Sequence, residues 1–213
     1  MSRPPTPGLR ESILRAAEPI FSRRDYHEVA MDEVAGASGV GKGTLYRYFP
    51  GKRQLYVAVV LAGIGRLRQD LEAAVAAEPT PGGRIGQIVR GLLAYFWDRR
   101  RFFALVHWGE QPPDAHARAW RRHRVALSRL VQQVLEEATA AGQIRGGDAR
   151  LAAEMLLGMV RGANRHRTKD DTLDALAAAV VDVFLRGVGT PAGRRALAAG
   201  RRPPPLTGGG GAH

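Results

Sequence analysis

Residues 36–44 read GASGVGKGT, and this stretch decides the fold because two different structures fit its letters. Gly36, Gly41 and Lys42 match the first seven positions of the phosphate-binding loop G-x-x-x-x-G-K-[ST]. Backbone amides would then cradle phosphates, and Thr44 would lie near magnesium. The same stretch also suits a short turn that leads into the recognition helix of a helix-turn-helix motif. The first structure predicts a phosphotransferase and the second a DNA-binding protein.

The sequence around this stretch favours the helix-turn-helix. A phosphate-binding loop follows a buried strand in a fold that alternates strands with helices. Residues 27–35, HEVAMDEVA, instead have the acidic residues and spacing of a short helix, and no apolar run ending in Asp follows to hold magnesium. Apolar residues recur at helical spacing along the chain, without sustained strand-like alternation. We therefore expect an all-α protein that is not an enzyme, with an ATP- or GTP-using enzyme as the main alternative.

Composition narrows the possible functions only modestly. The chain has 213 residues, a formal charge of +12 and no cysteine, which excludes disulfides, thiolate zinc sites and cysteine nucleophiles. Positive charge suits nucleic acid, yet residues 1–60 hold nine Lys/Arg against six Asp/Glu, a net of +3. Residues 1–12 are polar and Pro-rich, and no apolar run approaches the roughly 20 residues of a membrane span. These features predict a cytoplasmic protein with no membrane partner.

Residues 9–77 carry the pattern of a three-helix DNA-binding unit followed by a long helix. Apolar spacing predicts helices at 9–23, 31–37 and 42–48, and a helix from about 51 to 77. Gly39 fits a C-terminal cap and permits the turn between the second and third helices. The residues expected to seal this unit against its first helix are Val34, Ala35, Val40, Leu45 and Phe49.

The third predicted helix and its flank supply the candidate DNA contacts. These residues are Lys42, Gly43, Thr44, Tyr46, Arg47, Tyr48 and Lys52. Hydroxyls and ammonium groups bind phosphate, the Thr44 methyl can meet thymine, and Arg47 can read guanine or bind phosphate. Gly43 allows close approach of the backbone to DNA, and no acidic residue occurs from 34 to 69. Tyr46 and Tyr48 could instead be core aromatics, and Lys52 could be merely solvated.

The remainder of the chain is predicted to be a second all-helical half. PTPGG at 79–83 is typical of a linker, and the segment from about 191 to 213 has the composition of a disordered tail. The predicted helices lie near 84–98, 101–108, 115–141, 148–164 and 172–187. The last two are apolar over wide arcs, which predicts burial in the core or against a partner subunit.

Aromatic residues in this half suggest a small-molecule site. Residues 95–108, YFWDRRRFFALVHW, could line an apolar pocket or fill the core. The candidate pocket residues are Phe103, His107, Trp108, Trp120, Met155 and Met159. Arg161, Asn164 and Arg165 could meet an anionic ligand or cap carbonyls.

The histidines give no comparable support for a metal site. His116 and His123 share a helical face but are crowded by arginines, so we expect no metal. We also expect no cofactor and no catalytic residues, because no nucleophile–base arrangement or carboxylate pair with catalytic spacing stands out.

The N-terminal pattern resembles that of TetR-type transcriptional regulators. The resemblance rests on IL-x-AA-x-x-x-F at 13–21, on Tyr26, and on DEVAGASGVGKGTLYRYFPGKRQLY at 32–56, within a match of about 8–68. It implies a DNA-binding domain at 8–68, with its motif at about 31–49, and a helical effector-binding and dimerisation domain at 69–190. It also implies three partners: double-stranded operator DNA, a small-molecule effector and a second copy of the chain.

The resemblance further implies a ligand-responsive repressor, although the sequence does not fix the sign of regulation. The last two long helices would pair with a second subunit. A bound effector would tilt the long helix from about 51 and spoil the spacing of the two recognition helices, which must lie about 34–36 Å apart. The resemblance gives the DNA-contact roles to six of the candidate residues: Lys42, Gly43, Thr44, Tyr46, Tyr48 and Lys52.

Three positions depart from the family pattern. Ala30 stands where a Ser or Thr usually caps the second helix, and Gly41 stands where Ser is common at the start of the recognition helix. Asp25 replaces a glycine and is expected to tolerate a left-handed backbone. The first two departures leave a third possibility open, a helical interaction protein whose DNA-binding head has decayed.

Overall fold

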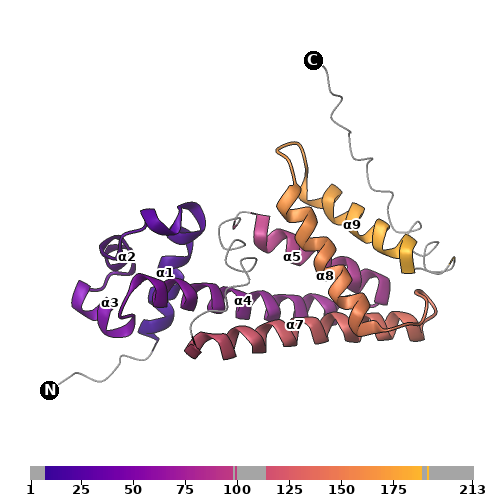
Figure 1. Cartoon of the computed structure of the whole chain (residues 1–213), viewed down its shortest axis with the longest axis horizontal. Coiled ribbons are helices and arrows are strands. Elements are labelled where there is room, and N and C mark those ends of the chain that lie inside the picture. The colour runs from indigo at the N-terminus through magenta and orange to yellow at the C-terminus, as the bar shows by residue number, and fades with distance from the viewer. Residues whose placement is uncertain (1–7, 98, 100–113, 189–190, 192–213) are drawn as a thin grey trace, which may run out of the picture. The chain divides into compact units, whose positions relative to one another are not determined.

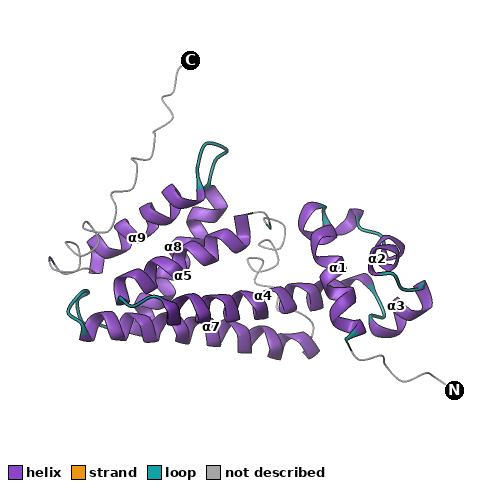
Figure 2. Ribbon diagram, turned by 180° about the vertical axis from the view of Figure 1, so that it is seen from behind, coloured by secondary structure: helices purple, strands orange, loops and turns teal. Residues whose placement is uncertain are grey.

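The computed structural model describes residues 8–97, 99, 114–188 and 191. It divides into two compact units, one within residues 1–66 and 98–123 and the other within 67–97 and 124–213. The described residues form helices joined by turns and loops, as Figure 2 shows. None of these helices combines the length and apolar character needed to span a membrane. The predicted all-α fold is confirmed.

The first unit contains the predicted helix-turn-helix. Its helices are α1 (Leu9–Arg23), α2 (Met31–Ser38), α3 (Lys42–Tyr48) and the start of α4 (Lys52–Ala77), with a short 3-10 turn, η1, at Tyr26–Glu28. Helix α2 packs against both α1 and α3. Figure 1 shows α1, α2 and α3 grouped beside the beginning of α4.

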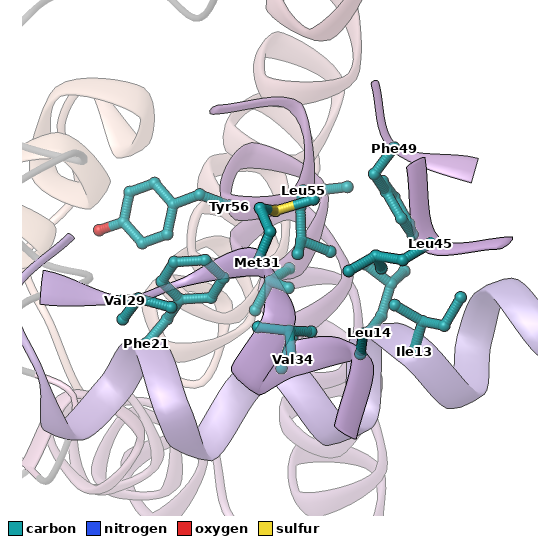
Figure 3. Packing of buried hydrophobic residues seen from close by; sticks show 14 of the residues in the cluster. Ile13, Leu14, Phe21, Val29, Met31, Val34, Leu45, Phe49, Leu55 and Tyr56 are labelled. Carbon is teal, nitrogen blue, oxygen red and sulfur yellow. The ribbon is translucent and has the colours of Figure 1, made fainter. Parts of the chain in front are cut away.

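Side chains from all four helices meet in one apolar core (Figure 3). Leu45 of α3 is fully buried, as are Ile13 of α1 and Val34 of α2. Tyr56 of α4 packs its ring 5.0 Å from that of Phe21, centroid to centroid. Burial raises the pKa of Tyr56 to about 12, so its hydroxyl stays neutral at physiological pH. This core holds α2 and α3 in a fixed arrangement.

The turn between α2 and α3 depends on one glycine, as predicted. Gly39 has a φ of +68°, a left-handed conformation that most side chains disfavour. Its N–H donates to the Gly36 carbonyl at 3.1 Å, and the Val40 N–H donates to the Ala35 carbonyl at 3.1 Å. These bonds satisfy carbonyls that the end of α2 would otherwise leave open.

The start of α2 and the loop before it show how the sequence departures are accommodated. Ala30 occupies the N-cap position of α2 and provides no side-chain hydrogen bond. Asp25 does not need the left-handed backbone that aspartate tolerates, because its backbone is extended, with φ −66° and ψ 143°. Its N–H donates to the Glu28 carboxylate at 3.1 Å, so Asp25 opens the η1 turn in an ordinary conformation.

The second unit is a helical domain built around α5 (Pro81–Trp97), which packs against α8 (Ala149–His166) and α9 (Leu173–Val188). Helix α8 also packs against α9. Helix α7 (Asp114–Ala140) contributes its later turns to this core. The buried residues of α5 are Ile85, Ile88, Val89, Leu92, Leu93 and Phe96.

The predicted linker at 79–83 is shorter than expected, because Pro81 is already the first residue of α5. Proline suits this position, since its missing N–H would have no partner in the first turn. The Thr80 hydroxyl accepts a hydrogen bond from the Gly83 N–H at 3.1 Å, as a helix cap does. The predicted helix at 101–108 and the predicted tail lie outside the described residues, apart from residue 191.

Candidate nucleic-acid interface

Helix α3 has one buried face and one exposed face. Leu45 is fully buried, and Phe49, just after the helix, is 2% exposed. Tyr46 is 40% exposed, and Arg47 is also exposed. Lys42 and Gly43 are exposed as well, whereas Thr44 and Tyr48 are half-buried. The seven-residue helix therefore presents polar and aromatic groups to solvent while its apolar residues hold it to the core.

The stretch GASGVGKGT spans the end of α2, the turn and the start of α3. A helix, not a strand, precedes it, so it lacks the strand that aims a phosphate-binding loop. A side chain built at Gly41 or Gly43 would meet nothing within 4 Å. These glycines leave the beginning of α3 open to another molecule.

Lys42 does not stand alone on this surface. Its ammonium contacts the Asp32 carboxylate at 2.9 Å, and both side chains are more than 60% exposed. Hydrogen bonding to Asp32, together with that residue's charge, raises the pKa of Lys42. An acidic group of α2 therefore offsets the positive charge of Lys42. This contact was not predicted from the sequence, because Asp32 lies just before the range 34–69 that contains no acidic residue.

Lys52, the first residue of α4, bonds within the domain. Its ammonium donates to the carbonyls of Val29 at 2.9 Å and His27 at 3.1 Å. It also lies 4.8 Å from the centroid of the Tyr26 ring, a cation–π contact. Two of the three ammonium donors are thus used to close the loop before α2 onto α4. One N–H of the Lys52 ammonium is then left for the predicted phosphate contact.

Two guanidinium groups near α3, those of Arg47 and Arg10, lie over aromatic rings. The Arg47 guanidinium carbon lies 5.7 Å from the centroid of the Tyr48 ring. On the neighbouring helix, the guanidinium of Arg10 lies 5.3 Å from the Phe49 ring. Planar cations held over rings in this way keep their charge near the protein surface, where phosphate can meet it.

An ion-pair cluster joins α1 to α4 within the first unit. Glu18 of α1 is 13% exposed at its side chain and pairs with Arg66 of α4. Its other carboxylate oxygen accepts a bond from Arg99 at 3.1 Å. A carboxylate with two guanidinium partners is well compensated, so this cluster ties α1 to α4 at a second place besides the apolar core.

Only three of the six predicted effector-pocket residues lie in the described part of the chain. Phe103, His107 and Trp108 lie outside the described residues. Trp120 is partly buried against the core of the first unit. Met155 is 57% exposed on α8, and Met159 is half-buried. Within the described ranges, no group of three or more His, Asp or Glu residues is placed to hold a metal ion.

Comparison with known proteins agrees with this geometry. Residues 13–59 match the family model for bacterial regulatory proteins of the tetR family. Residues 78–188 match a model of the Tetracyclin repressor-like C-terminal domain. A helix-turn-helix unit followed in the sequence by a helical C-terminal domain is typical of a class of bacterial transcriptional regulators. The chain belongs to the TetR family, which confirms the resemblance found in its sequence.

Individual relatives are matched to different extents. The HTH-type transcriptional regulator BetI of Rhizobium meliloti is 32% identical over 84 residues, which cover 39% of this chain and 41% of BetI. The HTH-type transcriptional repressor BepR of Brucella suis is 30% identical over 165 residues, covering 72% of this chain and 77% of BepR. The crystal structure of FadR from Bacillus subtilis with stearoyl-CoA has a TM-score of 0.68 at 19% identity, covering 83% of this chain and 98% of FadR.

Replacement of Lys52 tests its internal role. Lys52→Met keeps the aliphatic stem but removes both carbonyl contacts and the charge over Tyr26. We expect the free energy of unfolding to fall by about 1–3 kcal/mol, since hydrogen bonds from charged groups are the stronger ones. Urea denaturation followed by circular dichroism measures this loss. Arg53→Met, at the exposed neighbouring position, serves as the control; equal stability of the two variants would show that Lys52 is a surface residue only.

Proposed function

We propose that this protein is a sequence-specific DNA-binding regulator, most simply a repressor released from its operator by a small-molecule effector. The observation that carries the proposal is the two-faced α3, whose Leu45 is buried while Tyr46 and Arg47 are exposed. In a helix-turn-helix the second helix enters the major groove and reads base edges. The family match over residues 13–59 supports this role for α3.

Each exposed residue of α3 has a role that its chemistry permits. Arg47 can bind guanine with two parallel hydrogen bonds or pair with phosphate. Thr44 and the tyrosine hydroxyls can donate to phosphate, and Gly43 removes a side chain where the backbone must come close. Lys42 would exchange its Asp32 partner for a phosphate, because both carry the negative charge that its ammonium requires.

Salt dependence of operator binding tests this proposal. The probe is the DNA upstream of the protein's own gene, in a band shift repeated across salt concentrations. We expect selective binding that weakens with salt. We also expect Lys42→Met to lower the slope of log K against log salt by about 1.8, because a dimer loses two phosphate contacts at about 0.9 each.

The matched control is Lys169→Met, which removes the same charge from an exposed loop position between α8 and α9. Its slope should equal that of the wild type. Binding that ignores salt, or an equal change in both variants, would contradict the proposal that α3 faces DNA. Asp32→Asn provides a reciprocal check, since removing the competing carboxylate should strengthen binding.

The second copy of the chain is proposed to bind on α8 and α9. Leu151 and Met155 are 51% and 57% exposed, and Gly158 and Gly162 continue the same face of α8. A side chain at either glycine would meet nothing within 4 Å, so a neighbouring helix could approach closely. Val183 of α9 is 59% exposed. Exposed apolar residues on a regular stripe are typical of a subunit interface.

A charged substitution within this stripe tests the dimer. Met155→Arg places a cation where two apolar faces would meet, so we expect a monomer in light scattering coupled to size-exclusion chromatography. Gln133→Arg adds the same charge at an exposed position of α7 and should leave the dimer intact. If Met155→Arg stays folded and dimeric, the interface lies elsewhere.

Effector coupling is proposed to pass through α4. This helix runs without a break from Lys52 to Ala77, and the Glu18–Arg66 pair fastens its middle to α1. Tilting of α4 would therefore move the helix-turn-helix as well. A ligand can shift this equilibrium only by its differential affinity for the two states.

Stearoyl-CoA is the first effector probe, because the FadR structure of similar fold holds it. If it is the effector, binding should weaken operator affinity by roughly 5–150-fold, the usual range of allosteric coupling. A thermal-shift assay shows separately whether the probe binds. Binding of stearoyl-CoA with unchanged operator affinity would reject it as an effector.

A further inference from the structure

Asn164, in the last turns of α8, is buried without a hydrogen-bond partner among the described residues. It is 2% exposed and continues the inward stripe formed by Ala153, Leu156 and Val160. Neither its Nδ2 nor its Oδ1 meets a partner in the described part of the chain. Buried polar groups are nearly always satisfied, so an open carboxamide requires an explanation. It is also the chain's sole asparagine.

Neither helix capping nor a subunit contact explains this side chain. The C-cap of α8 is Arg167, whose N–H donates to the Ala163 carbonyl at 3.0 Å, so the carboxamide takes no part in it. The proposed dimer stripe, which includes Leu151 and Met155, lies on the opposite face of α8. Since Asn164 is already covered in the single chain, a second subunit cannot reach it.

Aromatic and polar groups lie around the ends of α5 and α8. Arg167 donates to the Trp97 carbonyl, and its guanidinium carbon lies 3.9 Å from the centroid of the Trp97 ring. These contacts bring the last residue of α5 next to the end of α8. The hydroxyl of Tyr95, in the last turn of α5, is also shielded from solvent. Apolar walls with a few convergent polar groups are typical of small-molecule sites.

We propose that Asn164 is the polar anchor of the effector pocket and binds the uncharged carbonyl or hydroxyl head of a largely apolar molecule. This inference rests on the proposed function. A carbonyl oxygen would accept from Nδ2, and a hydroxyl could both accept from Nδ2 and donate to Oδ1. The apolar tail would follow the stripe of Leu156 and Val160. A cationic head is disfavoured, because Arg165 and Arg167 follow closely in the chain and make this end of α8 positively charged.

The single asparagine makes a direct experiment possible. Protein labelled with ¹⁵N only in asparagine gives one carboxamide NH₂ signal, which belongs to Asn164. The probes are octanamide, 1-octanol and octyltrimethylammonium, which share an alkyl chain and differ in the head group. We expect the first two to shift this signal and the cation to leave it unchanged.

Substitution gives the second readout. Asn164→Leu should weaken binding of octanamide and 1-octanol by about tenfold, the loss expected for one hydrogen bond. The variant should also melt at a higher temperature without ligand, because an unsatisfied buried group is removed. Arg165→Leu, at the exposed neighbouring position, should bind both probes as the wild type does.

Two results would overturn the inference. One is a labelled signal that neither octanamide nor 1-octanol moves, a measurement that needs no variant to fold. The other is equal probe binding by wild type and Asn164→Leu. Operator binding without ligand separates the two proposals: if the wild type binds its operator but Asn164 fails these tests, only the anchor is wrong. If the wild type binds no operator, the proposed function fails.

Discussion

Burial of one face of α3 is the constraint on which the rest of the first unit depends. Leu45 and Phe49 enter a core built by α1, α2 and α4, and Gly39 supplies the left-handed residue that lets α3 turn into it. With its apolar residues fixed there, a seven-residue helix has only one way to direct Tyr46 and Arg47, which is toward solvent. The exposed face is thus a consequence of packing, and its availability to DNA follows from the same residues that stabilise the domain.

Neighbouring groups of the domain bind the ammonium groups of both lysines on this surface. Asp32 holds Lys42, and the carbonyls of His27 and Val29 hold Lys52. Both ammonium groups are therefore held by contacts within the domain, which reduces the free positive charge of this surface. Exposed ion pairs of this kind contribute little to stability, so loss of the Lys42–Asp32 pair would destabilise the fold only slightly.

Local patterns in the sequence predicted much of this fold. The bounds of α1 and α3 agree with the predicted 9–23 and 42–48, because apolar spacing and the Gly39 turn act over a few residues. Contacts between distant residues could not be predicted in this way. Lys52 reaches carbonyls more than twenty positions earlier, and the Lys42–Asp32 pair exists only because the turn brings two helix starts together. Asn164 appeared in the sequence as a residue that could meet a ligand or cap carbonyls, and only the packed helices showed that it is buried.

The two units provide different features that a TetR-family regulator uses. The first supplies an exposed recognition helix on a fixed core, and the second offers an exposed apolar stripe on α8 together with a buried, unsatisfied carboxamide on its opposite face. We propose that the outer face of α3 meets the operator. A photoreactive amino acid in place of Tyr46 tests it most directly. We expect this residue to crosslink to operator DNA, whereas the same group in place of Gln133, at an exposed position of α7, should not. Crosslinking from position 133 but not from 46, in protein that still binds the operator, would contradict this role of α3.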